Sequence, residues 1–196
     1  MTLVVSSLSG QKTNQGSTYK KCFIGSTLFL LGNFLPNEVN PPSFVQLNFG
    51  YRLNPKNIIS IEAKIWKYAW SLGIPYGKSF EAPEEKFPGY IREYGLAIVY
   101  QLFLWKGLYT ANHVLNVKQT FVDNNGKKIK NGYQMFNTYR LGYHVPFLKK
   151  RFFIEPSISV THRLIQSKMP SSFAVLNDKW PKYFWPEPGL HVGYKF

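Results

Sequence analysis

Histidines are the residues of this chain best suited to acid–base chemistry, and the sequence has four of them. His162 is the strongest catalytic candidate, because it lies near the end of an alternating segment and a serine-containing loop follows it. Acyl hydrolysis needs a serine or an activated water beside a positioned histidine. The other histidines, His113, His144 and His191, show no metal-ligand spacing, so neither a metal nor another cofactor is expected. For all four, a hydrogen-bonded interior side chain is the simpler interpretation. The serines that follow His162 are Ser167, Ser171 and Ser172.

Charged side chains form a second group with possible chemistry. Ten of them occupy the more polar positions of segments in which apolar residues recur at every second position. In a narrow interior such charges are expected to pair, because an unpaired buried charge costs about 3–5 kcal/mol. The structural interpretation is an ion-pair network that fills the interior, and the functional alternative is an ion pathway. The ten residues are Arg52, Glu62, Lys64, Glu93, Lys118, Arg140, Glu155, Arg163, Glu187 and Lys195.

The elements that must position these residues are β-strands. A period of two predicts strands with one apolar and one more polar face. We expect the apolar set outside and the polar set inside, which would point Lys118 inward. The segment 20–31 is the weakest prediction, because both of its faces are apolar near residues 28–31. The eight predicted strands are 20–31, 44–53, 59–66, 93–104, 109–118, 138–145, 152–161 and 187–196.

Connection lengths and aromatic positions indicate that these strands cross a membrane. The predicted connections alternate between long and short, as they do in transmembrane barrels. Aromatic residues gather near both sets of connections, which is typical of two membrane interfaces. Tyr51, Trp105, Tyr109, Tyr143, Phe152, Tyr194 and Phe196 form one set, and Tyr68, Trp70, Tyr90, Tyr94, Phe121 and Tyr133 form the other.

Composition sets further bounds. The net charge is +14, yet charged residues make up only 17% of the chain and aromatic residues another 17%. No apolar run reaches the roughly 20 residues of a spanning helix. The basic residues are scattered and form no recognition module, so no nucleic acid partner is expected. Residues 1–10 are interpreted as the remnant of a secretory signal peptide and residues 11–196 as a single barrel domain.

The C-terminal segment carries the one specific motif, an alternating tail that ends on an aromatic residue: Leu190, Val192, Tyr194 and Phe196. With this tail, residues 20–196 resemble the small eight-stranded outer-membrane β-barrel proteins, the class of OmpX and of the transmembrane domain of outer-membrane protein A. The resemblance implies an all-β, antiparallel up-and-down transmembrane barrel with short periplasmic turns, long extracellular loops and both termini in the periplasm. It also implies that the tail is an assembly signal for the barrel-assembly machinery. Outer-membrane lipid and lipopolysaccharide are the expected surroundings, and a monomer is the expected state.

Three functions remain open. The first is a structural or surface-interaction role through the extracellular loops of a barrel with a filled interior. The second is a lipid A-modifying acyl hydrolase that uses His162. The lipid A deacylase family is similar in placing a histidine late in the chain with a serine two residues on, but here that position is Leu164. The third is a soluble lipocalin-like barrel, because two-faced alternation is equally expected there. The loop residues proposed for binding are Lys127, Lys128 and Lys130, for phosphate, and Trp180, Tyr183 and Trp185, for a glycan, a lipid or a protein, unless they pack as a lid.

Overall fold

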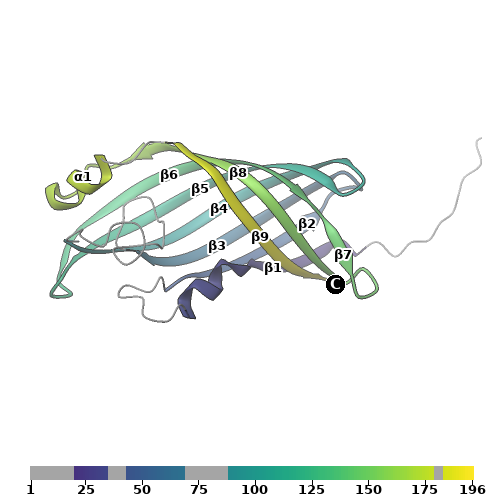
Figure 1. The fold of residues 1–196 in the computed structure, drawn as a ribbon, viewed down its shortest axis with the longest axis horizontal. Helices are drawn as coiled ribbons and strands as arrows, with labels where there is room; N and C mark the ends of the chain where they lie inside the picture. The colour runs from purple at the N-terminus through teal and green to yellow at the C-terminus, as the bar shows by residue number, and fades with distance from the viewer. Residues whose placement is uncertain (1–19, 35–42, 69–87, 179–182) are drawn as a thin grey trace, which may run out of the picture.

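A computed structural model describes residues 20–34, 43–68, 88–178 and 183–196, and shows one antiparallel sheet (Figure 1). The predicted signal remnant, residues 1–10, lies outside the described residues, as does Trp180. The strands are β1 (Cys22–Thr27), β2 (Val45–Arg52), β3 (Asn57–Tyr68), β4 (Gly89–Trp105), β5 (Leu108–Asp123), β6 (Lys128–Tyr143), β7 (Val145–Phe147), β8 (Phe152–Gln166) and β9 (Tyr183–Lys195). Two short helices accompany them, the 3-10 helix η1 (Leu28–Phe34) and the α-helix α1 (Ser171–Asp178).

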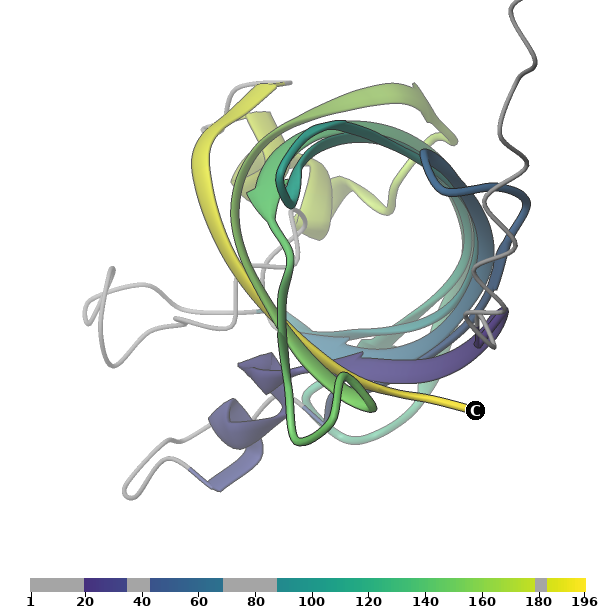
Figure 2. The ribbon, with the colours of Figure 1, turned by 90° about the vertical axis from the view of Figure 1, so that its right-hand side faces the viewer.

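Eight of these strands form a closed ring. Strands β1 to β6 pair in sequence order, β6 pairs with β8, β8 with β9, and β9 with β1. The short strand β7 follows His144 and extends the edge of β8. Figure 2 shows the ring from the end that carries the C-terminus and the turns at 53–56, 106–107 and 148–151, here called the short-turn end. The opposite end, which carries η1 and α1, is called the loop end. The predicted all-β ring of eight antiparallel strands is therefore confirmed.

Several predicted strand bounds differ from the structure, and two of these differences have a local reason. The first strand ends at Thr27, whose hydroxyl accepts a hydrogen bond from the Phe29 amide (3.3 Å) and begins η1. The predicted long connection at 123–132 is a tight turn. The Asp123 carboxylate accepts hydrogen bonds from the amides of Asn125 (2.9 Å) and Lys127 (2.8 Å), and β6 begins immediately afterwards. Lys128 and Lys130 are consequently strand residues rather than loop residues.

The outer face of the ring is largely apolar. Side chains such as Leu47, Ile61 and Ile98 are 51–61% exposed, whereas their neighbours along the same strands are buried. The inner face holds polar and charged side chains together with small clusters of apolar ones. For β2, β3, β4, β6, β8 and β9 this matches the facing expected from the sequence.

Strand β5 reverses the expected facing. Leu115 and Val117 are buried in a cluster with Ala97 and Phe136, and Lys118 is exposed on the outer face. The prediction that Lys118 points inward is wrong because ladder register, and not polarity, sets which face a residue joins. Ala97 of β4 is small and pairs with Leu115, so apolar side chains of β5 fill the interior there. Three aromatic residues assigned to the two interfacial sets are likewise buried: Tyr68, Tyr109 and Phe121.

A glycine lies beneath an aromatic ring at the β1–β2 pair. Gly50 pairs with Phe23, and a Cβ at Gly50 would overlap the Phe23 ring, which packs edge-on against Phe153 (5.3 Å between centroids). We expect Gly50→Val to lower the free energy of unfolding by about 1–3 kcal/mol, because overpacking displaces the ring. Denaturant titration measures this change. In the double variant Gly50→Val/Phe23→Ala the loss should be smaller than the sum of the two single losses; strict additivity would contradict the overlap.

Candidate functional site

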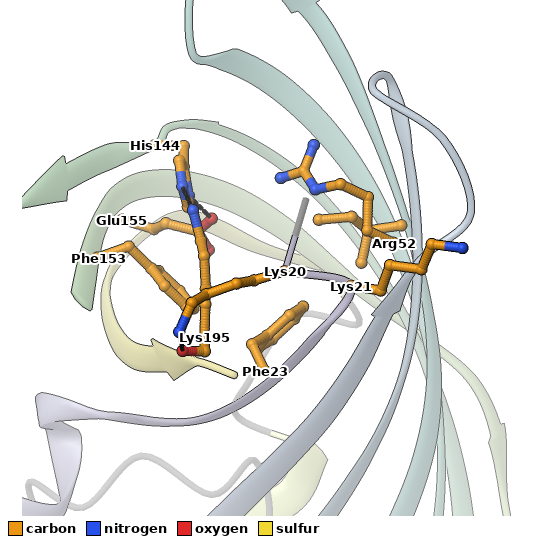
Figure 3. A pocket seen from close by; sticks show the side chains of 9 residues that line it. Lys20, Lys21, Phe23, Arg52, His144, Phe153, Glu155 and Lys195 are labelled. Atoms are coloured by element: carbon orange, nitrogen blue, oxygen red, sulfur yellow. Dashed lines mark hydrogen bonds and ion pairs between the residues drawn. The ribbon is translucent and has the colours of Figure 1, made fainter. Parts of the chain in front are cut away.

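The interior polar network is the candidate site, and its first cluster lies near the short-turn end (Figure 3). The Nδ1 atom of His144 lies 2.6 Å from Oε1 of Glu155, and Nζ of Lys195 lies 2.7 Å from Nε2 of His144. An ammonium group only donates, so Nε2 accepts from Lys195 and Nδ1–H donates to Glu155. The amide of Gln101 also donates to Glu155 (3.2 Å). A neutral histidine therefore bridges a lysine and a glutamate.

Aromatic rings and strand ends hold this cluster in place. The His144 ring packs against Phe153 (4.9 Å) and edge-on against Phe103 (5.6 Å). The Arg52 guanidinium lies over the same Phe103 ring (4.9 Å) and donates to the Pro55 carbonyl (2.9 Å). A small cavity opens here. Its lining includes Lys20, Lys21, Phe23, Arg52, Ile58, His144, Phe153, Glu155 and Lys195.

A second cluster lies in the middle of the ring. The Nε2 atom of His113 lies 3.3 Å from Oε1 of Glu62, and both side chains are buried. A cavity beside them is also lined by Arg140 and His191. Nε of Arg140 and Nδ1 of His191 have no hydrogen-bond partner among the described residues. This part of the network is thus only partly satisfied by the protein itself.

A third cluster lies toward the loop end. Oε1 of Glu93 accepts hydrogen bonds from the Tyr68 hydroxyl, from Nε2 of Gln119 (3.1 Å) and from Nε2 of Gln134. These four side chains are between 0% and 2% exposed. Gln166 donates in turn to Oε1 of Gln119 (3.1 Å). One carboxyl oxygen therefore gathers donors from β3, β5 and β6.

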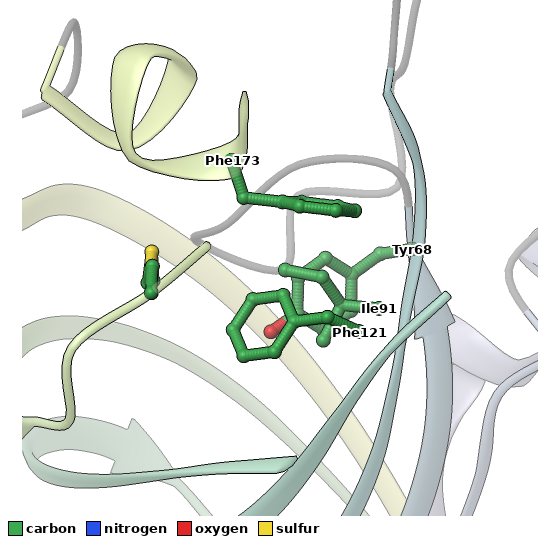
Figure 4. Close-up of a cluster of buried hydrophobic side chains, with 5 residues drawn as sticks. Tyr68, Ile91, Phe121 and Phe173 are labelled. Atoms are coloured by element: carbon green, nitrogen blue, oxygen red, sulfur yellow. The ribbon is translucent and has the colours of Figure 1, made fainter. Parts of the chain in front are cut away.

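An apolar cluster adjoins the third cluster through Tyr68, which belongs to both (Figure 4). Phe173 of α1 packs against Phe121 (5.1 Å between centroids) and joins Tyr68, Ile91 and Met169. The helix thus places a buried side chain over the interior. The sequence allowed for a lid formed by aromatic residues of the last connection. In the described part of that connection, Phe173 of α1 packs over the interior.

Nine of the ten predicted interior charges lie on the inner face, and Lys118 is the exception. Their contacts differ from the expected ones. Glu62 and Glu155 contact the histidines His113 and His144, and not the lysines or arginines that were expected as their partners. Arg163 donates to Asn177 of α1, and the Thr161 hydroxyl donates to Glu187 (2.6 Å).

The structure does not assemble an acyl hydrolase site around His162. This residue lies on the outer face of β8 and stacks on Tyr183 (4.3 Å between centroids, 9° between planes). Ser167 accepts a hydrogen bond from the Tyr133 amide (2.8 Å), and Leu164 is exposed. Among the described residues, no carboxylate or hydroxyl forms a hydrogen bond or ion pair with His162. Ser171 and Ser172 are exposed at the start of α1.

The remaining predicted residues lie at the two ends of the ring. Lys127 is in the β5–β6 turn, and the ammonium group of Lys130 donates to the Lys168 carbonyl (3.0 Å). Tyr183 and Trp185 are 58% and 66% exposed in β9. The tail residues Leu190, Val192, Tyr194 and Phe196 share the outer face of β9.

The network includes residues that the sequence analysis did not assign to it. His113 and His144 were interpreted as hydrogen-bonded interior side chains but were not assigned to the network of charged residues, and Tyr68 was assigned to an interfacial set. Gln119 and Gln134 belong to no motif or charged group that the sequence analysis considered. The correct facing of β5 would have identified His113 and Gln119, because both alternate with Lys118.

No group of three or more metal-ligating side chains occurs within residues 20–34, 43–68, 88–178 and 183–196. In the same part of the chain, no helix is long and apolar enough to span a bilayer. A comparison with family models finds no match to the sequence, and a comparison with curated proteins finds none either.

Proposed function

We propose that the chain is a bacterial outer-membrane β-barrel with a filled interior, which acts as a structural or surface-interaction protein through its loop end. The observation that carries this proposal is the distribution of polarity between the two faces. Glu62, Glu93 and His113 are buried inside, whereas large apolar side chains are exposed over most of the outside. A water-soluble ring would place its large apolar side chains inside and its charged side chains outside.

The extent of the apolar surface supports a membrane environment. Exposed aliphatic and aromatic side chains recur on the outer faces of β2, β3, β4, β6 and β8. Monomeric soluble proteins rarely expose a contiguous apolar patch of more than a few hundred Å². In a bilayer the same surface faces hydrocarbon, and the closed ring satisfies the backbone groups of the strands. This favours the membrane barrel over a soluble lipocalin-like carrier.

The contents of the interior favour a structural role over an ion pathway. An eight-stranded ring is just wide enough for side chains to fill it. Here the cluster of Glu93 and the apolar cluster around Phe173 occupy the interior toward the loop end, and that of Glu155, His144 and Lys195 occupies the short-turn end. In the proposed orientation the short turns and both termini are periplasmic, and the tail of β9 is the assembly signal.

The test is the gel mobility of the purified protein after refolding in detergent. A folded transmembrane barrel resists unfolding by detergent, so the unboiled protein is expected to run at a different apparent mass from the boiled one. The membrane fraction of expressing cells should also retain it after washing with carbonate. A protein that remains in the aqueous fraction without detergent, and whose mobility boiling does not change, would overturn the proposal.

A further inference from the structure

The outer face near the loop end carries a group of basic residues that the interior network does not use. Lys67 of β3 and Arg92 of β4 are Cα partners in the ladder. Lys118 of β5 is two residues from Thr120, the next partner of Arg92. Like charges directly opposite each other on a sheet are destabilising. Lys67, Arg92 and Lys118 are here called the basic wall. A nearby anion would reduce the repulsion between their charges.

The described carboxylates do not provide that anion. Glu62, Glu93, Glu155 and Glu187 lie on the inner face. The Asp123 carboxylate accepts hydrogen bonds from amides of its own turn, and the Asp178 carboxylate accepts one from Asn177 of the same helix. The two histidine–glutamate pairs do not involve the basic wall. The charges of the wall thus remain uncompensated by the carboxylates that the structure describes.

Tyrosines flank the basic wall as they would at a membrane interface. The ammonium group of Lys67 and the guanidinium of Arg92 lie 5.4 Å and 5.8 Å from the centroid of the Tyr90 ring. Lys118 pairs with Tyr94 on one side and with Tyr133 on the other. Both tyrosines are exposed on the outer face. Tyrosine beside lysine and arginine is typical of headgroup depth.

The position of the wall along the strands fits the same depth. A strand crosses the hydrocarbon layer with about 9–11 residues. The segment from Asn57 to Lys67 in β3 has this length, and its outward residues Ile59, Ile61 and Ile65 are apolar and exposed. With the short turns at the periplasmic surface, the basic wall reaches the headgroups of the outer leaflet.

We propose that Lys67, Arg92 and Lys118 bind a phosphate group of lipid A from the membrane side of the barrel wall. Arginine presents a planar pair of donors to phosphate oxygens, and the two ammonium groups add charge. This site rests on the proposed function. It differs from the phosphate contact expected from the sequence, because it lies on the outer face of β3, β4 and β5 and not on the β5–β6 turn with Lys127.

The test compares two triple variants of the full chain in detergent micelles. One is Lys67→Gln/Arg92→Gln/Lys118→Gln. The matched control, Lys56→Gln/Lys106→Gln/Lys149→Gln, removes the same charge from the exposed short-turn end. Binding of diphosphorylated lipid A is measured by native mass spectrometry. A basic residue near an anionic surface contributes about 1 kcal/mol. We therefore expect about 100-fold weaker binding in the wall variant and little change in the control.

Three results would overturn the site even if the wall variant binds lipid A more weakly. These are equal weakening in both variants, unchanged binding of enzymatically dephosphorylated lipid A, and full competition by inorganic phosphate, which would indicate a general anion site. The gel mobility of each variant is read in parallel. A variant that still shifts on boiling but binds lipid A like the wild type removes the site and leaves the barrel proposal intact. Loss of the shift in the wild type removes the barrel proposal itself.

Discussion

Replacing Glu93 with alanine is expected to lower the free energy of unfolding by about 3–5 kcal/mol, because each buried donor left without an acceptor costs about 1–3 kcal/mol. Tyr68, Gln119 and Gln134 all donate to the same oxygen of Glu93. All three are buried, and Tyr68 also packs in the apolar cluster of Phe121 and Phe173, so solvent does not easily replace the missing acceptor. Urea titration of the protein in lipid vesicles measures the change.

Two variants separate hydrogen bonding from charge at this position. Glu93→Gln keeps an Oε1 acceptor in the same place and is expected to retain most of the stability. Tyr68→Phe removes one donor and leaves the other two, and is expected to cost about 1 kcal/mol. If Glu93→Gln were as damaging as Glu93→Ala, the negative charge would be the stabilising feature. If Glu93→Ala cost less than Tyr68→Phe, the cluster would not act as described.

The ring of strands could be predicted from the sequence because most strands alternate apolar and polar residues. A strand between an apolar environment and a polar interior alternates with a period of two, and β2, β3 and β4 show this in their burial. The tight turns at 53–56 and 106–107 lie where the sequence predicted short connections. The alternation failed at Thr27, whose hydroxyl accepts a hydrogen bond from the Phe29 amide where η1 begins. The hydrophobicity of residues 28–31 does not distinguish a strand from a short helix.

Strand β5 shows why alternation alone does not fix facing. Either set of alternate residues in β5 can occupy the outer face, provided that each polar side chain there has a hydrogen-bond partner. On the outer face, Nδ2 of Asn112 donates to Oδ1 of Asn137 (2.9 Å), and the Tyr133 hydroxyl donates to Oδ1 of Asn116 (2.7 Å). Cross-strand pairs of this kind reduce the cost of placing polar groups on a largely apolar face. The register with β4 and β6 decides the facing, and no single segment contains that information.

The interior partners were unpredictable for a related reason. Alternation identifies the inner face but not which residues of distant strands lie at the same height. His144 and Glu155 are close in the chain, yet Lys195 joins them only because β9 pairs with β8 and closes the ring through β1. The cluster of Glu93 likewise needs β3, β4, β5 and β6 in register.

The largest effect expected from the outer surface is that of Ile98→Arg. Ile98 is 61% exposed and pairs with Ile61, near the middle of the apolar part of β3 and β4. On a soluble protein, a substitution at so exposed a position changes stability by only about 0.5 kcal/mol. On the lipid face of a barrel, arginine at the bilayer midplane costs about 2–4 kcal/mol. The predicted loss therefore depends on the environment and not on contacts within the chain.

Ile129→Arg is the matched control for Ile98→Arg. Ile129 is 45% exposed and lies in β6 beside the turn at 124–127, beyond the basic wall and away from the expected hydrocarbon layer. Its replacement is expected to change the free energy of unfolding in vesicles by less than about 1 kcal/mol, because charged residues near the interface cost little. A small effect at both positions would mean that the apolar outer face does not meet lipid. A large effect at Ile98 alone places the middle of β4 in the hydrocarbon, since both isoleucines have exposed side chains.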